Sequence, residues 1–169
     1  STCDANNGIP KRDREIIEFA AIMYNLDTKM IEDEFSMFVK PVLNPILTNY
    51  CTDLTSIEQE ELNDSPHFSE VLAFFKEWLE EYKGEKTFCS WSTADKIQLI
   101  NDCDRHDEDY PFSEDHIDIK KLFSTIKGYK RKYSLSAALN KMRMEFEGTQ
   151  HRGIDDARNT ARLYEELLK

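Results

Sequence analysis

The last twenty residues hold the side chains best suited to chemistry. From Gln150 they read QHRGIDDARNTARLYEELLK, with His151 five positions before Asp156 and with Asp155 next to that aspartate. Carboxylates in the first turn of a helix complement its positive dipole end, which stabilises the helix by about 0.3–1 kcal/mol. The same residue types also suit a hydrolytic site, where a carboxylate holds a metal ion and a histidine moves a proton. The pattern alone favours the helix-start explanation.

Asp95 is a second acid at a position where chemistry is expected. The segment KTFCSW (86–91) predicts a short interior strand, and STADKIQLINDCDRH (92–106) predicts the helix that follows. In α/β proteins, ligands bind beyond the carboxyl ends of strands, which is where Asp95 and Asp156 fall. Oxygen ligands suit Mg²⁺, and two such ions can stabilise the attacking water and the leaving oxygen of a phosphodiester. The alternative is that Asp95 is only a first-turn helix acid and His151 an ordinary loop histidine.

The rest of the chain predicts the elements that must position these residues. Hydrophobic periodicity and turn residues give, in order, a hairpin of two strands (15–26 and 30–41), one or two short helices (49–62), an amphipathic helix (68–82), the strand and helix described above, a short strand (116–119), helices at 120–127 and 134–144, and the final helix. This order predicts an α/β fold, in which a mixed sheet is flanked by helices on both faces.

The whole chain has the size of one domain. Its 169 residues, 40% of them apolar, predict a single domain over residues 1–169 with a substantial core. No apolar run approaches the ~18–20 residues of a membrane span, and no signal-peptide pattern opens the chain, so we expect a soluble cytoplasmic protein without a membrane partner. The four cysteines lack CxxC spacing and are expected to be reduced. Cys103 and His106 have a metal-like gap, but no second pair with zinc spacing accompanies them.

The charge of the chain is unevenly distributed. A net charge of −11 argues against a polyanionic partner, because phosphate binding normally needs a basic surface. Residues 120–143 nevertheless carry eight cations and no acid, which leaves 14 of the 22 cations against all 33 acids elsewhere. Tyr129 and Tyr133 lie among these cations. The segregation predicts a local positive patch able to attract an anionic ligand, and the alternative of a solvated surface stays open.

Several segments, taken in order, resemble one family. WSTAD (91–95), SLSAALNKMRMEFEG (134–148) and HRGIDDARNTARL (151–163) are similar to motifs of the DEDDh, or DnaQ-like, 3′→5′ exonucleases. The likeness is greatest to the branch that trims histone-mRNA, ribosomal and small-RNA ends, with its KapD-like bacterial relatives. Residues 15–79 are also similar to the family's hairpin, its NP-x-L and LT-x-I segment and its first long helix. The resemblance therefore covers essentially the whole chain.

The resemblance implies a fold, an activity and site residues. The fold would be RNase H-like, and the protein a 3′→5′ exonuclease acting by a two-metal-ion mechanism with Mg²⁺ or Mn²⁺. It would hydrolyse single-stranded 3′ ends, RNA in preference to DNA, and release nucleoside 5′-monophosphates. By position, Asp156 resembles the aspartate that binds metal directly, Asp95 the one that reaches its metal through water, and His151 the general base.

Substrate-binding residues follow from the resemblance and from the charge pattern. Leu54 and Thr55 resemble the pair that meets the 3′-terminal base and its backbone, where a wedge would favour unpaired ends. Without the family, Leu54 reads as an ordinary core leucine. The residues of the basic stretch expected to guide the nucleic-acid backbone are Lys127, Lys130, Arg131 and Lys132.

The chain departs from the family's pattern at one point. The family's first motif, an Asp-x-Glu at the end of a central strand, supplies two of the four carboxylates, and no strand predicted within these 169 residues ends in it. The opening STCD resembles the residues that directly follow that motif. We therefore expect the strand and its two carboxylates immediately upstream of Ser1. The rival interpretation is a non-catalytic nucleic-acid or protein-binding module built on a nuclease fold.

Overall fold

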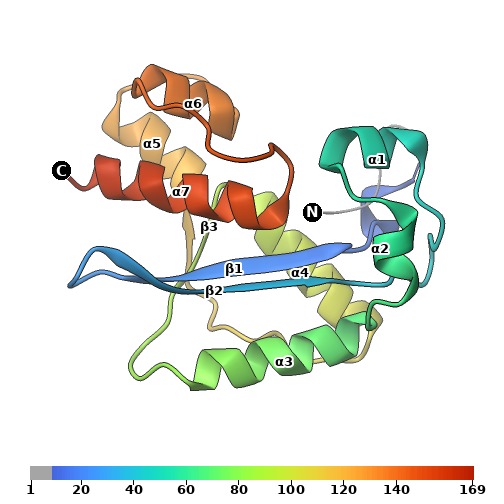
Figure 1. Cartoon of the computed structure of the whole chain (residues 1–169). Helices are drawn as coiled ribbons and strands as arrows, with labels where there is room; N and C mark the ends of the chain where they lie inside the picture. The colour runs from blue at the N-terminus through green and yellow to red at the C-terminus, as the bar shows by residue number, and fades with distance from the viewer. Residues whose placement is uncertain (1–8) are drawn as a thin grey trace.

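The structure is a computed structural model that describes residues 9–169 (Figure 1). In chain order its elements are a 3₁₀ turn (Lys11–Asp13), β1 (Glu18–Asn25), β2 (Met30–Phe38), α1 (Asn49–Thr55), α2 (Gln59–Asn63), α3 (Phe68–Glu80), β3 (Phe88–Ser90), α4 (Thr93–Arg105), β4 (His116–Asp118), α5 (Ile119–Ile126), α6 (Leu135–Lys141) and α7 (Gly153–Leu167). Every helix and strand expected from the sequence is present, although α6 ends three residues early. It ends there because Arg143 takes the left-handed conformation, with φ of 58°.

The strands form two ladders of opposite type. β1 and β2 pair antiparallel from Glu18 opposite Phe38 to Asn25 opposite Met30, with a register shift after Met23. β3 and β4 pair parallel over three residues each. The sequence predicts one mixed sheet, whereas within residues 9–169 the two ladders share no hydrogen-bonded strand. Both strand directions are present, but β1 and β3 are not neighbours by hydrogen bonding in the described part of the chain.

Helices cover both faces of the β1–β2 hairpin. In Figure 1, α7 crosses one face and α3 lies along the opposite one. The apolar side chains of α3 recur at positions 68, 71, 72, 75 and 78, the spacing that places them on one face of a helix. This face packs against Phe19 and Phe35 of the hairpin and against Val39. The amphipathic pattern of the sequence therefore specifies both the helix and the side that it buries.

A second core lies where α5, α6 and α7 meet. Its buried residues are Ile119, Phe123, Leu135, Ala138, Leu139, Leu163 and Leu167. Trp91, directly after β3, packs on its margin, and the backbone N–H of Lys120 donates to the Trp91 carbonyl at 2.9 Å. This core fixes the three C-terminal helices on each other and on the end of the parallel ladder.

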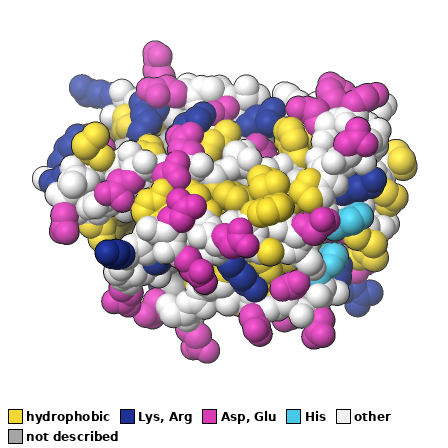
Figure 2. All heavy atoms as spheres, turned by 60° about the horizontal axis from the view of Figure 1, so that its bottom comes forward, with side chains coloured by type: hydrophobic (Ala, Val, Ile, Leu, Met, Phe, Trp, Pro, Cys, Tyr) yellow, Lys and Arg dark blue, Asp and Glu magenta, His cyan; other side chains and the backbone are white. Residues whose placement is uncertain are grey.

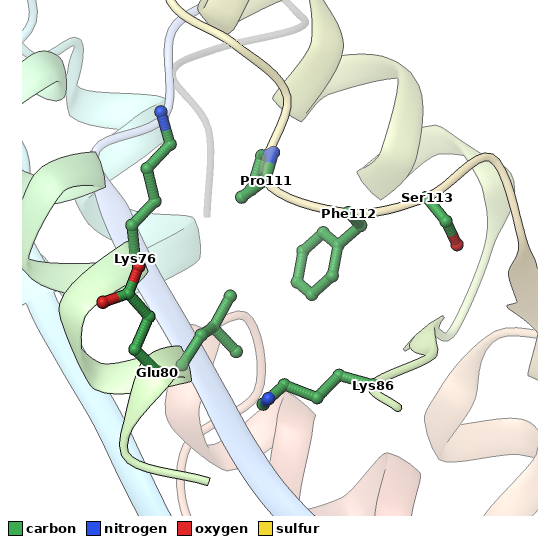
Figure 3. Close-up of a pocket in the computed structure, with 7 residues that line it drawn as sticks. Lys76, Glu80, Lys86, Pro111, Phe112 and Ser113 are labelled. Carbon is green, nitrogen blue, oxygen red and sulfur yellow. The ribbon is translucent and has the colours of Figure 1, made fainter. Parts of the chain in front are cut away.

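The outer surface carries an open groove remote from the acids singled out in the sequence. Figure 2 shows the side bearing α3, where acidic side chains surround a band of hydrophobic ones. A groove of about 330 Å³ lies between α3 and the segment before β4, lined by Lys76, Leu79, Glu80, Lys86, Pro111, Phe112 and Ser113 (Figure 3). Lys76 forms an ion pair with Glu108 at 3.6 Å, so part of its charge is neutralised within the protein.

No helix within residues 9–169 is long and apolar enough to cross a membrane.

Phe75→Ala is expected to lower the free energy of unfolding by about 3–5 kcal/mol, because it empties a buried site. The Phe75 ring lies 4.6 Å from the Phe19 centroid and 5.2 Å from that of Phe35. The neighbouring Phe74 is 49% exposed, so Phe74→Ala should cost less than about 1 kcal/mol. Urea unfolding of both variants measures the difference. Equal losses would show that α3 does not bury the face described.

Candidate active site

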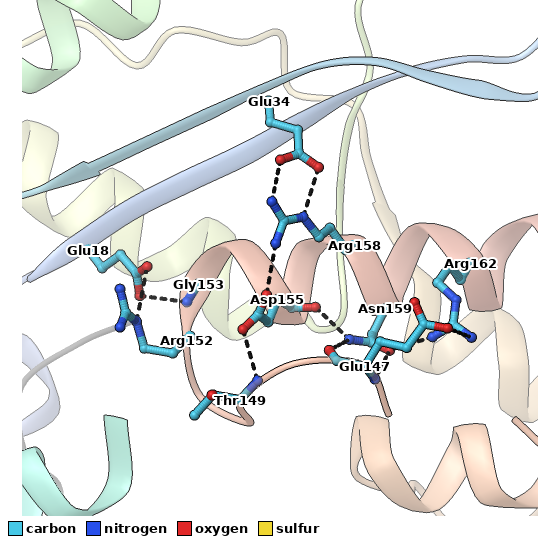
Figure 4. Close-up of polar contacts among 10 residues, drawn as sticks. All are labelled: Glu18, Glu34, Glu147, Thr149, Arg152, Gly153, Asp155, Arg158, Asn159 and Arg162. Carbon is cyan, nitrogen blue, oxygen red and sulfur yellow. Dashed lines mark hydrogen bonds and ion pairs between the residues drawn. The ribbon is translucent and has the colours of Figure 1, made fainter. Parts of the chain in front are cut away.

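The last helix begins on the surface of β1. Its N-cap residue, Arg152, has extended backbone angles and no side-chain cap. The first helical N–H, from Gly153, instead donates to Oε2 of Glu18 at 2.6 Å, and Nε of Arg152 lies 3.4 Å from Oε1 of the same carboxylate. The first turn of α7 therefore obtains its negative partner from a strand far away in the sequence, as Figure 4 shows.

Asp155 holds the loop that leads into α7. Its Oδ2 accepts the N–H of Thr149 at 2.8 Å, and its Oδ1 accepts from Nη1 of Arg158 at 2.9 Å (Figure 4). Gly148 has φ of +85°, and a Cβ at that position would lie 2.4 Å from Cγ of Asp155. Asn159 adds a second tether, since its amide donates to the Glu147 carbonyl at 2.7 Å. Asp155 therefore has a structural role. The side chain of its neighbour Asp156 accepts from a different group, the backbone N–H of His151.

His151 and Asp156 are held side by side. The backbone N–H of His151 donates to Oδ1 of Asp156 at 3.3 Å. His151 is exposed and takes the left-handed conformation with φ of 68°, which is uncommon for a residue other than glycine. Such backbone conformations persist where the surrounding structure enforces them, and they cluster at functional sites. The spacing of the two residues noted in the sequence thus corresponds to a direct contact.

Asp156 and Asp95 lie close enough to interact electrostatically. Burial raises the pKa of Asp156 above its ordinary value, the His151 N–H lowers it, and the charge of Asp95 raises it again. Asp95 is exposed at the start of α4, where its Oδ2 accepts the N–H of Ser92 at 3.2 Å in a capping box. The charge of Asp95 therefore acts on Asp156, and Asp95 is also a first-turn helix acid.

Asp118 joins the end of β4 to two helices, a role that sequence reasoning missed. It accepts the N–H of Lys121 at 2.8 Å and the hydroxyl of Thr93 at 2.8 Å. Burial raises the pKa of Asp118, but these hydrogen bonds and the charge of Lys132 outweigh it and hold the pKa below the ordinary value. The signal was present in the sequence, because an aspartate between a strand and an amphipathic run is a typical N-cap.

The described residues supply only part of a metal site. Asp95 and Asp156 present carboxylate oxygens, the donors that Mg²⁺ and Mn²⁺ prefer. Burial disfavours the charged form of Asp156, and a bound cation would offset that cost. Within residues 9–169, no three His, Cys, Asp or Glu side chains are grouped so that they could hold a metal ion. The donor chemistry of Asp95 and Asp156 therefore fits a divalent cation, and the two are candidate ligands.

Leu54 and Thr55, at the end of α1, differ in accessibility. Thr55 is 2% exposed, and its hydroxyl donates to the Cys51 carbonyl at 2.8 Å and accepts the N–H of Ile57 at 3.2 Å. Leu54 is 36% exposed. The side chain of Thr55 thus shapes the end of α1, while that of Leu54 is the one available to a ligand.

The basic stretch (120–143) forms a positive surface without internal ion pairs. Within residues 9–169, the ion pairs all involve cations outside this stretch. Lys127, Lys130, Arg131 and Lys132 are exposed in and after the turn that follows α5. The cations contact aromatic faces instead, with Lys141 4.9 Å from the Tyr129 ring centroid and Arg131 4.8 Å from that of Tyr133.

This surface borders the loop that carries His151. The hydroxyl of Ser136, in the first turn of α6, donates to the side chain of Gln150 at 2.9 Å. On the other side, the charge of Lys132 lowers the pKa of Asp118, so this lysine lies near the start of α4 and Asp95. The basic stretch therefore adjoins the loop that carries His151 and has Asp118 within range of its charge.

Comparison with known proteins identifies similar chains. The sequence profile of the exonuclease family RNase_T matches residues 2–164. The chain is 33% identical to ERI1 exoribonuclease 2 of Mus musculus, covering 100% of this chain but 27% of that protein, and 30% identical to the 3′-5′ exonuclease Snipper of Drosophila melanogaster, covering 100% and 66%. The solved nuclease domain of 3′hExo, a DEDDh family member bound to rAMP, matches with a TM-score of 0.92 at 28% identity, over 99% of this chain and 88% of that one.

These matches confirm the predicted α/β, RNase H-like fold. The chain spans about a quarter of the length of the ERI1 exoribonuclease 2 relatives that it matches. The likeness therefore concerns only a part of each of these relatives.

Asp156→Asn is expected to stabilise the metal-free protein at neutral pH. Burial holds the pKa of Asp156 above its ordinary value of 3.8, so the folded protein binds this proton more tightly than the unfolded chain does. Wild-type stability should therefore fall as the pH rises from the ordinary pKa through the folded-state pKa, whereas asparagine has no proton to lose. Unfolding in chelator as a function of pH measures the gap, which should vanish below about pH 3.

The matched substitution Asp155→Asn should act in the opposite direction. It removes a charged acceptor from Arg158 and Thr149, so it should lower stability at neutral pH by about 1–2 kcal/mol. Similar effects of the two substitutions would contradict the different environments assigned to these neighbouring aspartates.

Proposed function

Because the chain belongs to the RNase_T family of exonucleases, in the DEDDh superfamily, we propose that the protein is a metal-dependent 3′→5′ exonuclease acting on single-stranded RNA. It would release nucleoside 5′-monophosphates one at a time. The observation that carries the proposal is the contact between His151 and Asp156 at the start of α7, with the charge of Asp95 nearby. The contact, made by the backbone N–H of His151, supports a site in which a proton acceptor and two carboxylates act together.

The proposed roles follow from the chemistry of each side chain. Two Mg²⁺ or Mn²⁺ ions, when bound, would stabilise charge on the attacking and leaving oxygens of the phosphodiester. Asp156 and Asp95 would hold them. The imidazole of His151, exposed on its loop, would take the proton from the attacking water. Asp155 would keep that loop in place, because its carboxylate accepts the N–H of Thr149.

Two features support RNA as the substrate. Relatives matched over the whole chain carry the name exoribonuclease, and 3′hExo was solved with rAMP. In this protein, the exposed cations Lys127, Lys130, Arg131 and Lys132 would guide the phosphate backbone. The half-exposed side chain of Leu54 would meet the terminal base, with Thr55 fixing the turn beneath it.

The two remaining carboxylates would come from outside the described residues. Within residues 9–169, β1 pairs with β2 and β3 with β4, so each ladder has an edge that can accept a further strand. A strand ending in Asp-x-Glu, preceding Ser1 in the natural protein, would join the ladders and place its carboxylates beside Asp95 and Asp156. The residues encoded before Ser1 decide this point, since a segment without Asp-x-Glu would overturn it.

Incubation of a labelled single-stranded RNA with Mg²⁺ or Mn²⁺ tests the activity. Stepwise shortening from the 3′ end, abolished by a chelator and by Asp156→Ala, is expected. Salt-sensitive binding without shortening would instead support a non-catalytic binding module. His151→Ala should reduce kcat by about 10²–10⁴ while metal binding is largely kept. Unchanged turnover of this variant at neutral pH would exclude the general-base role.

Replacing Lys127, Lys130, Arg131 and Lys132 with glutamine should weaken RNA binding and flatten its salt dependence. Each lost phosphate contact lowers the slope of log affinity against log salt by about 0.7 for a single strand. KM for RNA should rise about tenfold with kcat nearly unchanged, because the phosphodiester chemistry is untouched. Lys29→Gln with Lys83→Gln is the control, since both lysines are exposed outside the stretch. Equal effects of the two sets would mean that the basic stretch is only a solvated surface.

A further inference from the structure

We propose that Glu18 is a positioning residue of the proposed active site. From β1, its carboxylate fixes the first turn of α7 and thereby the placement of His151 and Asp156. The inference rests on the proposed function for its catalytic consequence. The placement itself can be measured without any substrate.

Glu18 is a buried acid with an unusual set of partners. The residue is 2% exposed, and its Oε2 accepts the N–H of Gly153 at 2.6 Å. Nε of Arg152 lies 3.4 Å from Oε1 (Figure 4). The guanidinium of Arg152 also lies over the Phe38 ring, 5.3 Å from its centroid. A carboxylate out of contact with water is tolerated only where its oxygens are paired and hydrogen-bonded. Arg152 and Gly153, the two residues that follow His151, both contact this carboxylate.

Gly153 makes this close approach possible. A Cβ at this position would lie 3.1 Å from Cβ of Ala20 and 3.2 Å from Oε2 of Glu18. A methyl group here would be closer than an ordinary van der Waals contact, so the start of α7 or its neighbours on β1 would have to move by a few tenths of an ångström. His151 is two residues before this junction and Asp156 is three residues after it, so a shift of the junction moves both.

The other tethers of this region do not replace Glu18. Asp155 and Asn159 fix the preceding loop on α7 itself, so they would move with the helix. Arg158 also links α7 to the hairpin through two hydrogen bonds to Glu34 on β2, at 2.8 and 2.5 Å, but both side chains are partly exposed and Arg158 lies five residues beyond Gly153. Glu18 is thus a buried polar link between the hairpin and the first residue of α7.

Catalysis depends on this placement more than binding does. A displacement of about 1 Å of a catalytic group can reduce turnover by about a hundredfold. The cations that would hold the RNA lie in the basic stretch on α5, α6 and the turn between them, outside the Glu18 contacts. Loss of the Glu18 link should therefore lower kcat and leave KM nearly unchanged.

The test uses Glu18→Gln and Gly153→Ala in the full-length protein. Glutamine can still accept the Gly153 N–H but cannot form an ion pair with Arg152, and alanine at 153 crowds the junction of α7 with β1 while Glu18 is kept. Each should lower kcat for RNA about tenfold or more, with KM within about threefold. Hydrogen exchange should become faster at the amides of residues 149–156 and stay unchanged in α3. Having two variants guards against a folding defect in either one.

Asp33→Asn is the matched control. Asp33 lies on β2 and accepts from Nε1 of Trp78 at 2.7 Å and from the Tyr82 hydroxyl at 2.6 Å. Its loss should change exchange around α3 but neither kcat nor exchange at 149–156. A kcat within threefold of wild type for both Glu18→Gln and Gly153→Ala would overturn the proposal, as would faster exchange spread evenly over the chain. If wild type does not shorten RNA, the exchange comparison decides alone, and unchanged exchange at 149–156 in both variants refutes the positioning role.

Discussion

A buried carboxylate must be paired, and the pairing of Glu18 determines where the last helix begins. Its oxygens accept the first N–H of α7 and lie against Arg152, so the start of the helix is fixed on β1. Removing one partner of such a pair leaves an uncompensated charge, which makes the geometry hard to change. His151 and Asp156 flank this junction, and their contact depends on it.

The same constraint recurs around the start of β1. Glu15, also buried, accepts the N–H groups of residues 42–44, which fixes the loop that leads toward α1 and Leu54. Asp102 of α4 accepts the N–H of Ile16 at 3.1 Å, which anchors the helix that begins beside Asp95. Three buried acids, Glu15, Glu18 and Asp102, thus make their contacts at or near the start of β1. Through them α1, α7 and α4, the helices that carry the proposed site, are oriented. In a chain with 33 acids, these few have structural roles rather than surface ones.

Electrostatics divides the region into two parts. Burial and the charge of Asp95 disfavour the ionised form of the Asp156 carboxyl. Keeping this group ionised therefore costs stability, and a bound cation would offset that cost. The cations of the basic stretch form no ion pair within the described part of the chain. An acidic protein can therefore present a positive surface next to a carboxylate site, as a polyanionic substrate requires.

The sequence by itself determined the helices, the strands and the fold class, because hydrophobic periodicity is a local property and α3 or the β1–β2 hairpin can be read from it. It also placed His151 and Asp156 together, since both lie at one helix start. Only the tertiary structure decided which distant groups meet. The contact of Glu18 with Gly153 spans 135 positions, and the buried hydroxyl of Thr55 has its partners inside the fold. The partner of a buried polar group is set by how remote segments pack, and no local pattern records that packing.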